Sequence, residues 1–502
     1  MSDCAASCLI LIIPITFIGA ALICLLRLSD AGARRLALLT AATGLALGTI
    51  GTISYATSGG PAIQTLTDVP WIKSLGIHFL LAVDGISLTM VMLTGIAATT
   101  GVLFSWNVKT RVKEFFALYF ALIGGVYGVF MSFDLFLLFV FYELAIIPKY
   151  FLIAIWGSGE KRYAAMKLAL YSFVGSALVL IGMIGTYVVS GGETMNLIEL
   201  SQFPFPESFQ YWAFPMVFIG FAVLAGMWPF HTWAPTGHAA APTAASMLLA
   251  GVVMKLGAYG ALRVAVTLFP AGLAEWREVI GLLAVIGIIY GAGVALVQRD
   301  FKFVIGYSSV SHMGFVILGL VTLNEIGMSG AVLQMFSHGI IAGLLFGVVG
   351  RMVYDRAHTR QLTMLECMGL AKALPFAMVT FVIAGFASMG MPGFSGFVAE
   401  VQILIGAWHA SPKFALFAGV GIVIGVAYTL RVMNQVFFGD AKPGRQLTVP
   451  PTKPITIPEI VGSVMLIGCT LTVGLYPRIL LDLIVPSLHS PMFNALWKEA
   501  AL

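Results

Sequence analysis

Residues 374–410 read LPFAMVTFVIAGFASMGMPGFSGFVAEVQILIGAWHA, an apolar run with one acidic residue, Glu400, and no lysine or arginine. A helix needs about 20 apolar residues to cross a membrane, so this run is too long for one straight span. Its middle is Gly390-Met391-Pro392-Gly393. Proline lacks a backbone donor and glycine loosens a helical turn. The stretch therefore predicts a membrane helix that is broken near its centre.

The rest of the chain has the same apolar character. Of its 502 residues 59% are hydrophobic and only 10% are charged, with a mean hydropathy of +0.98. A water-soluble protein has about 25% charged residues, so this composition excludes a soluble domain and indicates a surface that faces lipid. The predicted fold is an all-α polytopic membrane protein of about 14 transmembrane helices. The predicted segments lie near 7–26, 36–55, 83–104, 114–133, 135–156, 166–190, 212–233, 243–268, 279–298, 303–323, 329–354, 374–410, 414–438 and 457–481.

A second apolar segment also carries helix-breaking residues. The seventh segment ends in Trp228-Pro229-Phe230-His231-Thr232-Trp233-Ala234-Pro235. Irregular backbone at membrane depth is tolerated only where protein or a water-filled cavity surrounds it. Two interruptions in separate halves indicate an internal repeat with binding sites at the breaks. The alternative is a pair of ordinary proline kinks.

The basic loop residues predict the orientation. Loops after even-numbered segments hold little beyond Lys73, Arg277 and Lys413. The positive-inside rule then places the odd-to-even loops in the cytoplasm, and both termini on the periplasmic side of a bacterial inner membrane. The N-terminus has no basic region before its first apolar run, which favours a first membrane helix over a cleaved signal peptide. The basic residues of the odd-to-even loops are Arg27, Arg34, Arg35, Lys109, Arg111, Lys113, Lys161, Arg162, Arg299, Lys302, Arg351, Arg356, Arg360, Lys372, Lys442, Arg445 and Lys453.

Patterns for cofactor or metal binding are missing from the sequence. Its five cysteines are scattered and form no C-x-x-C pair, which argues against an iron–sulfur or zinc site. It has no P-loop, haem-binding pattern or nucleophile elbow. We therefore expect no cofactor and no metal in this chain.

Three ionisable residues lie well inside apolar segments: Glu143, Lys255 and Glu400. Each costs about 2.5–3.5 kcal/mol to insert, so such residues usually mark a pathway for protons or small cations. The alternative is a set of static ion pairs, which return little stability because of their desolvation. Lys149 is nearer a helix end, where its ammonium could equally reach the interface.

Two histidines add capacity for a proton relay. His312 and His338 lie in the tenth and eleventh segments among serines and glycines, and a histidine titrates near neutral pH. The alternative is that both are hydrogen-bonded core residues. His231 and His238 border the break of the seventh segment. Burial disfavours the charged form of acids and bases alike, so such groups can exchange protons with one another.

Several short stretches spread along the chain form a recognisable set: Val83–Leu88, Phe141–Pro148, Trp156–Ser158, Pro229–Trp233, Ala241–Thr243, Asp300–Lys302, Tyr307–Gly314, Tyr354–Arg360 and Pro392–Glu400. In these stretches the sequence resembles the antiporter-like membrane subunits of the proton-pumping NADH:quinone oxidoreductase, respiratory complex I. The resemblance covers nearly the whole chain, and the Tyr354–Arg360 loop favours the M-type (chain 4) subunit over the L and N types.

The resemblance implies two inverted five-helix repeats with broken helices 7 and 12. The implied parts are an N-terminal three-helix segment (1–110), a first repeat (111–268), a second repeat (279–438) and a C-terminal helix (439–502). It also implies that Glu143, Lys255 and Glu400 occupy proton-pathway positions. NADH, FMN, iron–sulfur clusters and quinone would bind to partner subunits, and L-type and N-type chains would be neighbours in the membrane.

The chain departs from the family in its seventh helix. The family usually has a lysine seven residues before the histidine of Pro-x-His-x-Trp, and here that residue is Leu224. No lysine or arginine lies between Met195 and Lys255, so Glu143 lacks its usual basic partner. Lys149 or Lys255 takes that place, or this half-channel works differently. A divergent or duplicated M-type chain is a further interpretation.

The predicted function is proton translocation coupled to quinone reduction in other subunits. Two alternatives share many of these sequence features. One is a subunit of a multi-chain cation/proton antiporter, and the other is a membrane subunit of a related hydrogenase or ferredoxin-linked complex.

Overall fold

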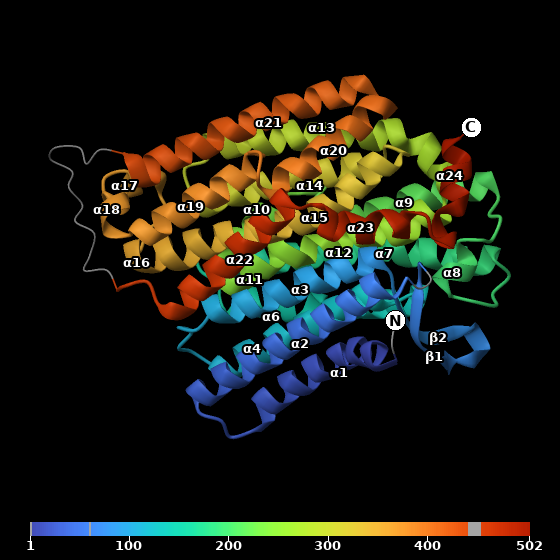
Figure 1. Cartoon of the computed structure of the whole chain (residues 1–502), viewed down its shortest axis with the longest axis horizontal. Helices are drawn as coiled ribbons and strands as arrows, with labels where there is room; N and C mark the ends of the chain where they lie inside the picture. Colours follow the sequence, from blue (N-terminus) through green and yellow to red (C-terminus); the bar gives the residue numbers. More distant parts are fainter. Residues whose placement is uncertain (1–2, 60–61, 440–452, 502) are drawn as a thin grey trace.

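The computed structural model describes residues 3–59, 62–439 and 453–501, which form a bundle of long helices running side by side (Figure 1). Thirteen of the described helices are long and apolar enough to cross a membrane. They coincide with thirteen of the predicted segments. The remaining one, 374–410, forms two shorter helices, α19 (Pro375–Ser388) and α20 (Ser395–Ala410). The predicted all-α polytopic fold is confirmed.

The long helices follow one another along the chain with short connections. Their bounds are α1 (Asp3–Leu25), α2 (Asp30–Ser58), α3 (Gly85–Phe104), α4 (Val112–Met131), α5 (Leu135–Leu144), α6 (Ile146–Trp156), α7 (Lys161–Val189), α9 (Glu207–Ala225), α13 (Pro270–Val297), α14 (Phe301–Leu320), α15 (Glu325–Phe346), α21 (Pro412–Met433) and α22 (Ile457–Leu475). The eighth span is composite, with α11 (Thr243–Leu248), η2 (Leu249–Val253), α12 (Met254–Gly260) and η3 (Ala261–Val266) in succession.

Both predicted helix interruptions are present. Helix α9 ends at Gly226, whose φ of +81° suits glycine, and α10 (Trp233–Ala240) begins seven residues later. The indole of Trp233 donates to the carbonyl of Val223 at 2.8 Å and ties the two pieces together. Between α19 and α20 the chain turns at Gly390 and Gly393, which also have positive φ. The arrangement of the two halves as inverted repeats stays a prediction.

Two features were not predicted. Residues 64–83 form an antiparallel hairpin of β1 (Gln64–Ile72) and β2 (Ile77–Val83), at the end of the bundle where both chain termini lie (Figure 1). The part 439–502 contains further helices besides the one predicted. After α22 the structure has α23 (Arg478–Leu488) and α24 (Asn494–Ala500), because Pro477 and Pro491 interrupt the apolar pattern. Lys442 and Arg445 lie outside the described residues.

Helices differ in how deeply they lie in the bundle. Almost every residue of α3, of the eighth span and of α15 is buried, whereas α2 and α21 leave most of their surface exposed. The central helices therefore pack against protein on all sides, and the peripheral ones present apolar side chains to lipid. Lys255 and His338 both lie on central helices.

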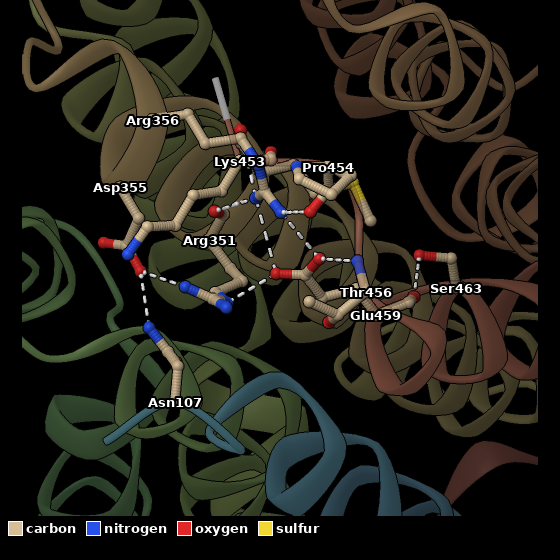
Figure 2. A network of polar contacts seen from close by, with 10 residues as sticks. Asn107, Arg351, Asp355, Arg356, Lys453, Pro454, Thr456, Glu459 and Ser463 are labelled. Atoms are coloured by element: carbon tan, nitrogen blue, oxygen red, sulfur yellow. Dashed lines mark hydrogen bonds and ion pairs between the residues drawn. The ribbon is translucent and has the colours of Figure 1, made fainter. Parts of the chain in front are cut away.

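A network of ion pairs joins elements at the end of the bundle opposite the termini (Figure 2). The carboxylate of Glu459, which is 1% exposed, lies 2.5 Å from Arg351 and 2.8 Å from Arg356. Arg351 also pairs with Asp355 at 2.9 Å, and Asn107 donates to the same carboxylate. Both arginines pair with one buried carboxylate, and Arg356 also hydrogen-bonds to it. The network therefore fixes α22 to η4 (Gly347–Tyr354) and α16 (Asp355–Ala357), which continue the chain from α15.

Candidate functional site

Lys255 lies in a span whose helical geometry is irregular on both sides of it. The π-helical segments η2 and η3 flank α12, which carries the lysine, and π turns inside helices occur frequently at functional sites. The Lys255 ammonium is fully buried and donates to the Ala250 carbonyl within η2. Its Nζ also lies 2.7 Å from Nδ1 of His338 on α15.

Two glycines bring these two spans close enough for that contact. A Cβ atom on Gly339 of α15 would lie 2.6 Å from the carbonyl oxygen of Gly251 in η2, nearer than real Cβ contacts come. A Cβ on Gly251 would in turn lie 3.2 Å from the Gly339 carbonyl. The absence of both side chains allows the backbones to approach, and this approach places Lys255 against His338.

The contact continues through two further residues. The rings of His338 and His312 lie 5.4 Å apart between centroids, and Nδ1 of His312 lies 2.9 Å from Oε1 of Glu400. Ser388 and Gln334 complete the surroundings, at 3.1 Å from His312 Nε2 and from Glu400 Oε1 respectively. Four of the predicted site residues, taken from four different spans, therefore form one line. We call Lys255, His338, His312 and Glu400 the central row.

The helix break beside Glu400 makes room for its carboxylate. Gly390 has a φ of +70°, and a Cβ there would lie 3.0 Å from Glu400 Oε2. A side chain at this position would therefore meet both backbone strain and the carboxylate. The predicted broken helix and the predicted acidic residue thus belong to the same local structure.

Several polar atoms beside the central row have no hydrogen-bond partner in the described part of the chain. They are Nε2 of His338, Oγ of Ser337 and Oε1 of Gln334. A buried polar atom is costly unless another group or an ordered water satisfies it. The surroundings of the row are therefore polar enough to hold water beside its four titratable side chains.

Glu143 lies apart from the central row. It is half-buried near the end of α5, and its Oε1 has no hydrogen-bond partner within the described residues. With Phe136, Val140 and Phe173 it lines an open cavity of about 400 Å³ on the side of the bundle. The ring of the preceding Tyr142 contacts Phe221 of α9 at 5.4 Å. The structure thus places the predicted acid on a lateral, mainly apolar face.

His238 lies between the central row and one end of the bundle. It is fully buried in α10, interacts electrostatically with both Lys255 and Lys302, and neither of its ring nitrogens has a partner among the described residues. Lys302 lines a cavity of about 160 Å³ together with Thr243, Tyr354 and Asp355. This cavity lies at the end that carries the basic loops. His231, at the break itself, packs its ring against Tyr290.

A buried ion pair in the same span as Lys255 was not predicted from the sequence. Arg263 donates to Asp84, the N-cap residue of α3, and both side chains are fully buried. Tyr259 joins them, because its hydroxyl lies 3.1 Å from Arg263 and 2.9 Å from Ser87. Arg263 stands in the predicted segment 243–268, so the cost of a charge in an apolar run, the signal that singled out Lys255, applied to it as well.

No group of three histidine, cysteine, aspartate or glutamate side chains that could hold a metal ion occurs within 3–59, 62–439 and 453–501.

Comparisons with known proteins match this architecture. The family model described as NADH:quinone oxidoreductase/Mrp antiporter, TM, matches residues 132–425. The NADH-quinone oxidoreductase subunit M of Rhodobacter capsulatus is 39% identical over 85% of this chain and 84% of its own length. The subunit M of Escherichia coli K12 is 38% identical over 88% of each chain.

A solved structure agrees with these sequence matches. A chain of respiratory complex I from Thermus thermophilus with bound NADH superposes with a TM-score of 0.87 at 27% identity, covering 98% of this chain and 99% of that one. The match extends over the central row and over both interrupted helices, because nearly all of each chain is aligned. This chain belongs to the NADH:quinone oxidoreductase/Mrp antiporter family of membrane subunits.

Proposed function

We propose that this chain is the proton-translocating M-type membrane subunit of a bacterial NADH:quinone oxidoreductase. The observation that carries the proposal is the central row, which connects Lys255 to Glu400 through two histidines in the middle of the bundle. The relatives at 39% and 38% identity are both named NADH-quinone oxidoreductase subunit M. These names favour this function over the antiporter and hydrogenase-related alternatives.

The contacts of the row suit stepwise proton transfer. A proton that leaves the Lys255 ammonium for Nδ1 of His338 leaves a neutral amine and crosses a 2.7 Å contact. On the other side, His312 hands a proton to the Glu400 carboxylate across 2.9 Å. Between the two histidines the described chain has a ring contact but no direct hydrogen bond: Nε2 of His338 has no partner, and His312 is engaged with Glu400 and Ser388. In this proposal the proton passes from His338 to His312 through water. Histidine suits both positions, because one ring nitrogen can accept a proton while the other releases one. The redox groups belong to partner subunits in this proposal.

We propose that protons enter from the end that carries the basic loops, which the positive-inside rule makes cytoplasmic. The cavity lined by Lys302 and Thr243 opens there, and His238 is within electrostatic range of both Lys302 and Lys255. His238 is therefore the group that passes protons from this cavity towards the row. Both termini then lie on the periplasmic side.

The lateral faces are where other membrane subunits of the complex would pack. Glu143 on such a face lines an otherwise apolar cavity, and a carboxyl group is costly in direct contact with lipid. Contact with neighbouring L-type and N-type chains would cover it. Residues 111–268 and 279–438 would be the two inverted repeats, each with one interrupted helix.

Replacing Lys255 tests the proposal. In the intact complex reconstituted into vesicles, K255M should slow proton transfer through this chain about 100-fold. Without the Lys255 amine, a proton that crosses this part of the bundle has no side chain to bind and meets about 3 kcal/mol of added barrier. The exposed Lys413, which pairs with Glu278 at the surface, provides the control variant K413M. Assembly is followed on native gels. Full proton pumping in an assembled K255M complex would contradict the proposed path.

A further inference from the structure

One buried cation of this chain differs from all the others. The buried lysines and arginines of the described ranges are Lys149, Lys255, Arg263, Lys302 and Arg356. Four of them bind an oxygen or nitrogen partner: Lys255 with Ala250 and His338, Arg263 with Asp84, Lys302 with Ala241, and Arg356 with Glu459. The ammonium of Lys149 has no hydrogen-bond partner in the described chain.

A structural role does not account for Lys149. Its side chain is only 1% exposed, so it does not reach the membrane interface as a snorkelling lysine does. It closes no ion pair of the kind that Arg263 makes with Asp84. A buried charge without compensation lowers stability, so a lysine at this position is unexplained as a stabilising residue.

The location of Lys149 relates it to Glu143. The fifth span is interrupted at Ala145, between the end of α5 and the start of α6. Glu143 lies just before this interruption and Lys149 shortly after it. The two interact electrostatically, so the charge on each affects whether the other holds a proton. No lysine or arginine occurs from 196 to 254, and Lys149 is the cation whose charge acts on Glu143.

We propose that Lys149 is a proton-carrying residue and the basic partner of Glu143 within a single interrupted span. This inference rests on the proposed function. The Lys149 ammonium gives up a proton and becomes a neutral amine, and the Glu143 carboxylate takes up a proton, through intervening water, and becomes a neutral acid. Reprotonation of the amine restores the charge. An acid and a base that lie six positions apart on one span thereby form an exchange unit separate from the central row.

The first test removes the charge and keeps the volume. In the assembled complex in vesicles, K149M should lower the number of protons pumped per quinone reduced. K149R should lower it as well, because a guanidinium keeps the positive charge but does not release its proton in proteins. Lys167 on the neighbouring α7, which lies against the ring of Tyr163, supplies the matched control K167M with normal pumping. If K149M does not assemble, K149Q serves as the polar, uncharged replacement.

The second test separates a proton-carrying role from a packing role. Leu224 lies one turn after Phe221, whose ring contacts Tyr142 beside Glu143, so a lysine at 224 can approach Glu143 from α9. The double variant K149M/L224K should recover pumping that K149M has lost, which a lost packing contact would not allow. Undiminished pumping in K149M, or no recovery in the double variant, overturns the inference. If either result is found while K255M still loses proton pumping, only the role of Lys149 is wrong and the proposed function stands.

Discussion

The two groups of buried ionisable residues are organised in opposite ways. In the central row, residues from four spans contact one another directly, and Ser388 and Gln334 supply further hydrogen bonds. Glu143 and Lys149 lie on one span, and neither Glu143 Oε1 nor Lys149 Nζ has a partner in the described chain. The comparison shows two ways to retain ionisable groups in a membrane protein: one group is solvated by its own chain, and the other depends on water or on neighbouring subunits.

Backbone irregularity is common to both groups. Lys255 lies between two π-helical segments, Glu400 follows the interruption at Gly390–Gly393, and Glu143 precedes the interruption at Ala145. Where helical hydrogen bonding is interrupted, carbonyl groups become available to side chains, as Ala250 is to Lys255. The irregular turns therefore contribute to the solvation of charges that the apolar side chains cannot stabilise.

After K255M, the next largest effect on pumping is expected from breaking the central row at its acidic end. E400Q keeps a side chain that can hydrogen-bond to His312 and Gln334 but removes its negative charge. We expect proton transfer through the chain to slow about tenfold, which corresponds to one pKa unit of lost interaction between neighbouring sites. Proton pumping by the reconstituted complex measures this. Gln402, on the same helix and outside the row, provides the control Q402L, and equal pumping by E400Q and Q402L would contradict the role of Glu400.

Much of the central row could be predicted from the sequence, because a charge in an apolar run is costly wherever it packs. That rule predicted Glu143, Lys255 and Glu400, and it applies equally to Arg263, which was not predicted. It could not tell that Lys255 contacts a histidine while Arg263 contacts an aspartate. These contacts depend on close helix packing at glycines such as Gly251 and Gly339, which periodicity does not reveal.

The interrupted helices and the hairpin show a similar limit. The prolines and glycines of 390–396 predicted a break, since these residue types act locally. The strands of residues 64–83 were not predicted, because their alternation of apolar and polar residues is short and lies next to the strongly apolar α3. The burial of Lys149 could not be derived either, because it depends on how α6 packs against its neighbours.

A smaller effect on the row is expected from closing the space beside Glu400. In G390A the new Cβ would lie 3.0 Å from Glu400 Oε2 on a backbone with φ of +70°. The left-handed conformation alone costs an alanine about 1–2 kcal/mol, so thermal unfolding should occur at lower temperature and pumping should fall severalfold. Gly419 of α21 offers the control G419A, because nothing lies within 4 Å of a Cβ there. Unchanged stability and pumping in G390A would show that the break tolerates a side chain.

The smallest effect on pumping is expected at Asp134, which anchors the helix that carries Glu143. Asp134 caps α5 by accepting from the backbone N–H of Leu137 at 2.9 Å, and it accepts from His78 of β2 at 3.0 Å. Burial raises the pKa of Asp134 from an ordinary value of 3.8 to about 6, while these backbone donors partly counteract the rise. Asp134 lies outside the central row, so D134N should pump normally at neutral pH.

The pH dependence of stability gives the sharper measurement on this residue. Because the pKa of Asp134 is higher in the folded chain than in the unfolded chain, the folded state binds more protons between about pH 4 and 6, and stability falls as the pH rises through that window. A shift from 3.8 to about 6 corresponds to a loss of about 3 kcal/mol. D134N should flatten this part of the unfolding profile, whereas E160Q, which removes an exposed carboxylate, should leave it unchanged. An identical slope in D134N and the parent chain would mean that Asp134 titrates normally, and that α5 is held by uncharged contacts at this end while its other end carries Glu143.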